Sequence, residues 1–194
     1  MPEVPRFPAR VLVASTVLAL IAAVATYVIL DGGDDEPEAT EPTVTVPLTP
    51  DPGDVDASTA AFTEFGSEAP VLLSSLRGKP VVVNFFASFC VPCITEMPAF
   101  EEVHQQVGDE VTFLGLAVAD REDEATDLVE RTGVTYRTAS DFRSEVFTAL
   151  GGTILPTTVL LDADGKVVEI HPGALKADAL RELLAEALGV RPPP

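Results

Sequence analysis

Residues 80–98 read PVVVNFFASFCVPCITEMP and contain both cysteines of the chain. The first seven residues form a short apolar run rich in β-branched and aromatic side chains, which predicts a buried strand. Residues 92–107 predict a helix with Pro98 inside it. Cys90 and Cys93 therefore lie at the point where a strand ends and a helix begins.

The spacing of the two cysteines favours redox chemistry. Residues i and i+3 at a helix start are close enough to form a disulfide. Cys90 lies at the helix N-terminus, where free backbone N–H groups and the helix dipole favour the thiolate that attacks disulfides. Cys93 lies one turn into the helix, so we expect it to be more buried and to displace a partner from a mixed disulfide.

Two other interpretations of the cysteine pair are a structural disulfide and half of a metal site. A bridge that closes so short a loop removes little entropy from the unfolded chain. A metal site needs two more ligands, and the only histidines are His104 and His171. Redox chemistry is therefore the favoured interpretation, with His104 expected on the surface of its helix and His171 in a structural role.

Apolar runs and helical periodicity continue through the rest of the globular region. Residues 162–165, DADG, form a good hairpin turn between two strands. The order strand-helix-strand-helix-helix-strand-strand-helix predicts an α/β domain with parallel and antiparallel strand pairs. The further strands are predicted at residues 111–118, 157–161 and 166–170, and the further helices at residues 122–131, 142–150 and 174–188.

The charge of the chain excludes one class of function. The 194 residues hold 12 Lys and Arg against 31 Asp and Glu, a formal net charge of -19. Nucleic-acid binding needs a basic face for the phosphates, which this composition does not favour. The acidic run from Asp120 to Asp127 is interpreted as the solvated start of a helix, where acidic side chains are favourable.

Three segments of different composition precede the globular domain, which we place at residues 59–194. Residues 1–10 carry two arginines, and residues 11–30 contain no charge. Twenty helical residues span ~30 Å, about one hydrocarbon core, so residues 11–30 predict a transmembrane anchor. Residues 31–58 are acidic and rich in proline, which predicts an unstructured linker.

The flanking charges predict the orientation of this anchor. Arginines precede the apolar segment and acidic residues follow it, so residues 1–10 are expected in the cytoplasm and the domain outside the cell membrane. A cleaved signal peptide is the alternative, because Ala23-Val24-Ala25 resembles a cleavage site. The apolar run continues past that point to Leu30, which favours the retained single-pass anchor.

Three stretches of the sequence resemble the thioredoxin-like proteins of the TlpA/ResA type. The active-site stretch VVVNFFASFCVPCITEMP is close to that family's VVNFWAxWCxPCxxExP. ILPTTV at residues 154–159, followed by LDADG at residues 161–165, looks like the family's xPTTFLIDxDG, and GAL at residues 173–175 looks like its terminal pattern. The resemblance covers roughly residues 59–190. It implies a thioredoxin-like fold, in which helices flank a mixed central sheet.

The resemblance also implies roles for individual residues. Cys90 would be the nucleophile, Cys93 the resolving thiol, and Glu96 a carboxylate that handles protons beside them. The family's cis proline would be Pro156, and the backbone before it would pair with a substrate chain. No cofactor and no resident metal are implied. The residues expected to contact substrate are Phe89, Val91, Pro92, Leu155 and Pro156.

Three positions decide how closely the family pattern applies. Asn84 stands where thioredoxins proper carry a buried aspartate, so a carboxylate relay would have to come from Glu96. Phe86 and Phe89 occupy positions where the family usually has tryptophan, and the chain contains no tryptophan. This change puts substrate preference in question more than the redox reaction.

These observations predict a membrane-anchored, extracytoplasmic thiol–disulfide oxidoreductase. By resemblance, its clients would be protein disulfides in cytochrome c maturation or copper-site assembly, and a membrane electron donor of the DsbD/CcdA type would reduce it. One alternative keeps the enzyme but reverses it into an oxidase that forms disulfides. Another is a copper-binding chaperone that uses Cys90, Cys93 and His171.

Overall fold

A computed structural model describes residues 59–193 of the chain. The predicted cytoplasmic N-terminus (residues 1–10), transmembrane anchor (residues 11–30) and linker (residues 31–58) lie outside the described residues. Within residues 59–193, no helix is both long enough and apolar enough to cross a membrane.

Strand β3 (Val81–Phe86) is an interior strand of a seven-stranded mixed sheet. All six of its residues are buried, as expected for an apolar run covered on both faces. It pairs in parallel with β4 (Thr112–Val118) and antiparallel with β6 (Thr157–Leu161), and the strand order is β2-β1-β5-β4-β3-β6-β7. The remaining strands are β1 (Ala61–Glu64), β2 (Pro70–Leu72), β5 (Arg137–Asp141) and β7 (Val167–Pro172).

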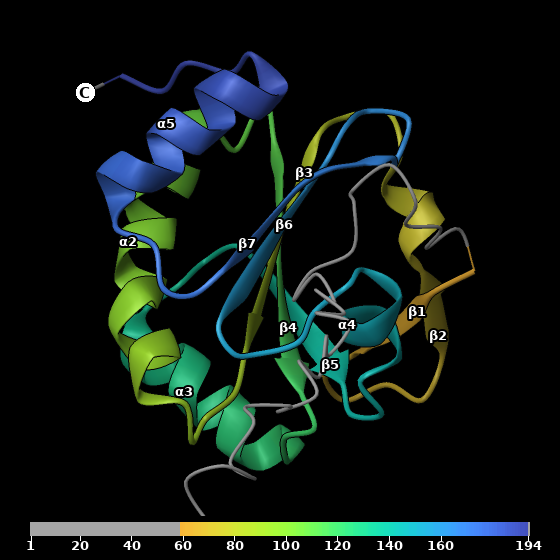
Figure 1. Ribbon diagram of the computed structural model, residues 1–194. Coiled ribbons are helices and arrows are strands. Elements are labelled where there is room, and N and C mark those ends of the chain that lie inside the picture. Colours follow the sequence, from red (N-terminus) through yellow and green to blue (C-terminus); the bar gives the residue numbers. More distant parts are fainter. Residues whose placement is uncertain (1–58, 194) are drawn as a thin grey trace, which may run out of the picture. The chain divides into compact units, whose positions relative to one another are not determined.

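Helices cover both faces of this sheet (Figure 1). Helices α2, α3 and α5 lie together on one face, where their apolar side chains share a core cluster with the sheet. The short helices α4 and η2 contribute to a second cluster on the opposite face. The helices are α2 (Val91–Val107), α3 (Glu122–Thr132), α4 (Glu145–Ala149), α5 (Ala177–Leu188) and the 3-10 helix η2 (Leu73–Leu76).

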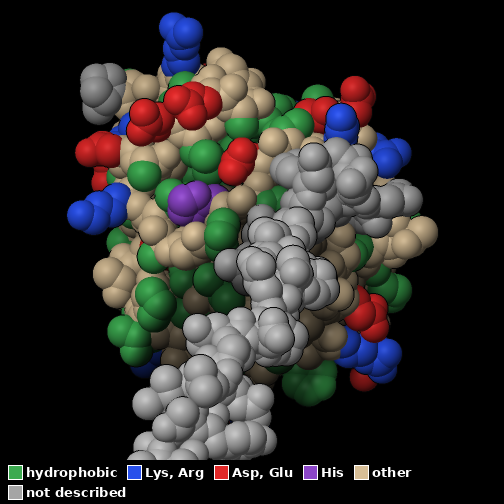
Figure 2. Space-filling view, viewed as in Figure 1, with side chains coloured by type: hydrophobic (Ala, Val, Ile, Leu, Met, Phe, Trp, Pro, Cys, Tyr) green, Lys and Arg blue, Asp and Glu red, His purple; other side chains and the backbone are tan. Residues whose placement is uncertain are grey.

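Charged side chains are spread over the surface of the domain. In the face that Figure 2 presents, acidic and basic groups lie mostly toward the margin, with hydrophobic and uncharged groups between them. The acidic side chains of the described residues are therefore not gathered into one patch on this face.

The predicted α/β order is confirmed, and three further strands complete the sheet. Strands β1, β2 and β5 were not predicted, because they are short and their sequences, AFTE, PVL and RTASD, lack a strong apolar pattern. The hairpin turn at residues 162–165 is confirmed: β6 and β7 pair antiparallel, and Gly165 takes a left-handed φ of 82°.

Two helices are shorter than predicted. The helix expected at residues 142–150 begins only at Glu145, because the Asp141 carboxylate accepts backbone N–H groups of the first turn and residues 142–144 form the turn before it. The helix expected at residues 174–188 begins at Ala177, after Gly173 takes a positive φ of 100°.

Candidate active site

The two cysteines form a disulfide at the N-terminus of α2, with their Cα atoms 5.3 Å apart. Cys90 is the N-cap residue of this helix, and its Sγ accepts the backbone N–H of Cys93 at 3.3 Å. Cys93 is fully buried, whereas Cys90 keeps 9% of its surface exposed. This difference confirms the expected order of burial: Cys90 is the more exposed of the two cysteines.

Exposed apolar side chains flank Cys90 in the chain. Phe89 and Val91, the neighbours of Cys90 in the chain, are 69% and 71% exposed. These two exposed apolar side chains are candidates for a contact surface. Pro92 is also exposed and occupies the first turn of α2, where a proline needs no N–H partner.

The loop before β6 lies at the same edge of the sheet as the disulfide. Phe85, near the end of β3, is paired with Thr157, the first residue of β6. The residues before Thr157 therefore lie beside the segment that leads from β3 to Cys90. The Leu155–Pro156 peptide bond is cis, as the resemblance implied, and Leu155 packs against the core cluster that contains both cysteines.

Glu96 is buried one helical turn beyond Cys93. Only 3% of the residue is exposed, and its two oxygens accept hydrogen bonds from Asn84 Nδ2 at 2.8 Å and from the backbone N–H of Leu175 at 2.9 Å. Burial disfavours the charged form and raises the pKa of Glu96 to about 7, although both hydrogen bonds act in the opposite direction. Glu96 can therefore hold or release a proton near neutral pH.

A cavity of about 370 Å³ lies between α2 and the start of α5, next to Glu96. Pro92 and Thr95 line it from the first turn of α2, and residues 174–177 line it from the other side. Glu96 itself lines this cavity together with the exposed Pro92.

Two buried polar atoms near Glu96 have no hydrogen-bond partner among residues 59–193. Asn84 Oδ1 and Thr158 Oγ1 are buried and accept or donate no hydrogen bond among residues 59–193. The two residues face each other in the register of β3 and β6. Apolar side chains would be more stable at these two positions, because a buried polar atom without a partner costs free energy. The sheet beneath the dithiol is therefore less stable than an all-apolar one.

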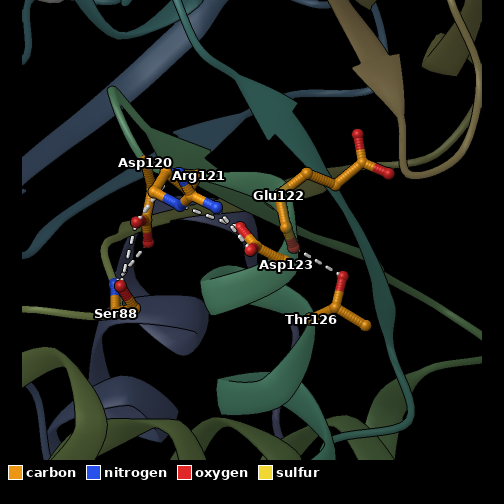
Figure 3. Close-up of polar contacts among 6 residues, drawn as sticks. All are labelled: Ser88, Asp120, Arg121, Glu122, Asp123 and Thr126. Atoms are coloured by element: carbon orange, nitrogen blue, oxygen red, sulfur yellow. Dashed lines mark hydrogen bonds and ion pairs between the residues drawn. The ribbon is translucent and has the colours of Figure 1, made fainter.

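Asp120 is a site residue that the sequence interpretation missed. It was grouped with a solvated acidic run, but only 5% of it is exposed. Its carboxylate accepts the backbone N–H of Ser88 at 2.5 Å and the Ser88 hydroxyl at 2.9 Å, as Figure 3 shows. The prediction of a solvated group holds for Glu122, Asp123 and Glu124, which are exposed, and is wrong for Asp120.

Neither histidine joins the dithiol in a metal site. His104 is half-buried against the rings of Phe113 and Tyr136, so its expected place on the surface is wrong. His171 is a half-buried residue of β7. In the part of the chain that the structure describes, no group of three or more His, Cys, Asp or Glu side chains could hold a metal. The copper alternative therefore lacks its ligand set.

Residues 53–186 match the Redoxin family, and because this match covers more than half of the chain, the protein belongs to that family. Within this class, the chain is similar to several ResA proteins. The thiol-disulfide oxidoreductase ResA of Geobacillus thermodenitrificans is 34% identical over 115 residues, which cover 58% of this chain and 65% of that protein. The ResA of Bacillus thuringiensis subsp. konkukian is 30% identical over 133 residues, covering 62% and 77%.

Solved structures support the same placement. MTB dsbF has a TM-score of 0.62 at 26% identity, and the match covers 69% of this chain and 98% of that one. A DsbF homologue from Corynebacterium diphtheriae has a TM-score of 0.59 at 28% identity, covering 71% and 90%. The predicted thioredoxin-like fold and the predicted ResA/TlpA-type family of thiol–disulfide oxidoreductases are thereby confirmed.

Proposed function

We propose that this domain exchanges thiols and disulfides with client proteins through Cys90 and Cys93, in the reducing direction. The observation that carries the proposal is the disulfide at the N-terminus of α2, in which Cys90 is partly exposed and Cys93 is fully buried. The helix N-terminus stabilises a thiolate at Cys90. The exposed Phe89 and Val91 offer apolar contacts to a client on either side of it.

The exchange proceeds in two balanced steps. In the reduced domain, the Cys90 thiolate attacks one sulfur of the client disulfide, and the other client sulfur leaves as a thiolate and takes a proton. Cys93 then loses its proton and attacks Cys90 Sγ, which releases the second client thiol and forms the Cys90–Cys93 disulfide. The client gains two electrons and two protons. Glu96, with its pKa of about 7, is the proposed acceptor of the Cys93 proton.

The charges near the dithiol favour a reductant over an oxidant. Strong oxidants of this class depend on a nucleophile with a very low pKa. Val91 and Pro92 between the cysteines add neither a cation nor a histidine, and an ionised Glu96 would repel a thiolate. We therefore expect a reduction potential nearer to ~-270 mV than to ~-120 mV.

The location and the partners of the domain belong to the same proposal. The uncharged residues 11–30 and their flanking charges support a single-pass anchor with the domain outside the cell membrane. A donor of the DsbD/CcdA type would then return electrons to Cys90–Cys93. The family resemblance supports clients in cytochrome c maturation or copper-site assembly.

Trapping of clients tests the nucleophile. In Cys93→Ala, Cys90 can still attack, but nothing within the domain resolves the mixed disulfide, so adducts should accumulate in cells and disappear on reduction. Cys90→Ala is the matched control and should form none. Equal adducts in the two variants would contradict the assignment of Cys90.

A redox titration followed by alkylation and mass shift tests the direction. Each 30 mV corresponds to ~1.4 kcal/mol for this two-electron couple, so the two expected potentials are easily separated. A value above roughly -150 mV would favour the disulfide-forming alternative.

A further inference from the structure

We propose that Asp120 and Ser88 are positioning residues for the dithiol: the Asp120 carboxylate clamps the turn that carries Phe89 and Cys90 in the orientation that disulfide exchange requires. This inference rests on the proposed exchange function of Cys90. Asp120 is a buried acid that takes no part in the exchange steps, and the clamp gives it a role.

The contacts of Asp120 are directed at this turn. One carboxylate oxygen accepts the Ser88 N–H at 2.5 Å, and the other accepts both the Ser88 hydroxyl and the Arg121 N–H at 2.9 Å. Two of these three bonds thus come from a single residue, which lies two positions before Cys90 (Figure 3). Hydrogen bonds to a carboxylate are stronger and shorter than those between neutral groups, so they hold both the backbone and the side chain of Ser88 in place.

The fold brings the two residues together from separate elements. Strands β3 and β4 are parallel neighbours, with Phe86 paired to Ala117. The residues that follow these two strands therefore emerge at the same edge of the sheet. Asp120 itself is held there, because the preceding Ala119 donates its N–H to the Asp141 carbonyl at the end of β5. The carboxylate thus connects the rigid sheet to the active-site turn.

The turn needs such a connection. Its own closure is one backbone hydrogen bond at 3.0 Å, from Cys90 N–H to the Ala87 carbonyl. Phe89 is 69% exposed, so packing restrains it little. Small misplacements of reacting groups lower exchange rates steeply. By holding Ser88, the clamp therefore fixes the Phe89 side chain, which contacts the client, next to Cys90 Sγ, which attacks the client disulfide.

Asp120→Asn and Asp123→Asn form a matched pair for testing the clamp. Both remove one negative charge from the same short segment. The Asp123 side chain is 66% exposed and pairs with Arg121. Two rates are measured in each reduced variant. The first is reduction of insulin disulfides, and the second is alkylation of Cys90 by iodoacetamide across a pH series.

The clamp predicts a separation of the two rates. Asp120→Asn should reduce insulin about tenfold more slowly or worse, while its limiting alkylation rate at high pH stays within about twofold of wild type, since a small reagent needs no alignment. Asp123→Asn should leave both rates within about twofold. An insulin rate near wild type in a folded Asp120→Asn, or an equal fall in Asp123→Asn, would overturn the clamp.

Serine variants keep the test decisive if Asp120→Asn folds poorly. Ser88→Ala removes the hydroxyl bond but keeps the N–H bond, so its insulin rate should fall by less, roughly threefold. Ser88→Thr keeps both donors and should restore the rate. Equal rates in Ser88→Ala and wild type would contradict the clamp. A wild-type domain that does not reduce insulin would overturn the proposed function itself. If wild type and Asp120→Asn reduce insulin equally well, only the clamp is overturned and the proposed function stands.

Discussion

The two faces of the central sheet differ in composition although they share strand β3. On the face toward α4, every side chain that β3 contributes is apolar. On the face toward α2, Asn84 interrupts the apolar cluster and donates a hydrogen bond to the buried Glu96. The dithiol lies on this second face. The residues of β3 toward α4 are Val81, Val83 and Phe85, and those toward α2 are Val82, Asn84 and Phe86.

This difference assigns the titrating carboxyl group next to the dithiol to one face of the sheet. A buried carboxyl costs free energy unless its charge is removed or compensated, and one face of the sheet bears that cost for a group that titrates near neutral pH. On the face toward α4, the side chains of β3 are all apolar, and the buried carboxyl of Asp141, at the end of β5, is compensated by backbone N–H groups of α4. Three substitutions test whether the two faces are independent in this way.

The largest effect on stability is expected from Phe85→Ala, on the apolar face. Phe85 is fully buried and packs edge-on against Phe147, with ring centroids 5.1 Å apart. Truncation should lower the free energy of unfolding by about 3–5 kcal/mol in urea titrations, while the pKa of Cys90 stays unchanged. Phe85→Leu, with a cost below about 1.5 kcal/mol, is the milder control. A shifted thiol titration in either variant would mean that the faces are coupled.

An intermediate, pH-dependent effect is expected from Glu96→Gln. The folded protein binds the Glu96 proton more tightly than the unfolded chain, because burial raises the pKa from 4.5 to about 7. The contribution of this group to stability is therefore fully present below pH 4.5 and is lost as the pH rises through about 7. Up to about 3 kcal/mol of unfolding free energy is at stake.

Urea titrations of the oxidised protein between pH 4 and 8 measure this loss, with Glu96→Gln as the reference. The free energy of wild type should fall relative to the variant across this range. Parallel pH profiles of the two proteins would return Glu96 to the role of an ordinary helix residue. The variant should also lower the pKa of an active-site thiol, because it removes a like charge.

The smallest effect is expected from Asn84→Ala, measured as the pKa of Glu96 by NMR of labelled glutamate carboxyl groups. The hydrogen bond from Asn84 stabilises the charged carboxylate, so its loss should raise the pKa of Glu96 further, by about one unit. Thr158→Val is the matched control: it removes a buried hydroxyl that has no partner within residues 59–193. An unchanged pKa in Asn84→Ala would show that the hydrogen bond from Asn84 does not influence the pKa of Glu96.

The sequence predicted the parts of the fold that depend on strong local signals. The apolar run of β3 and the cysteine pair before a proline-started helix are such signals, and the structure places both where they were expected. Strand β5 has none: its sequence RTASD is polar, and it becomes a strand because β4 on one side and β1 on the other offer it hydrogen bonds. Tertiary pairing of this kind is invisible to local periodicity.

The site divides in the same way. Cys90 and Cys93 were recognisable from spacing, and Glu96 from the family pattern. Asp120 was not, because its partner Ser88 lies 32 residues away and the neighbouring acids are solvated. One pattern in the sequence could have identified Asp120. If β3 and β4 are assumed to be parallel neighbours, a serine two residues after one strand and an aspartate two residues after the other must lie at the same edge.

The Cys90 side chain has a second task that connects redox state to helix stability. Its Sγ accepts the Cys93 N–H, so the atom that exchanges electrons is also the atom that ends the hydrogen-bond ladder of α2. Any change in the charge on this sulfur changes the strength of the helix cap. The amide proton of Cys93 is thus a built-in reporter, whose chemical shift and exchange rate follow each turnover from a fully buried residue of the first turn of the helix.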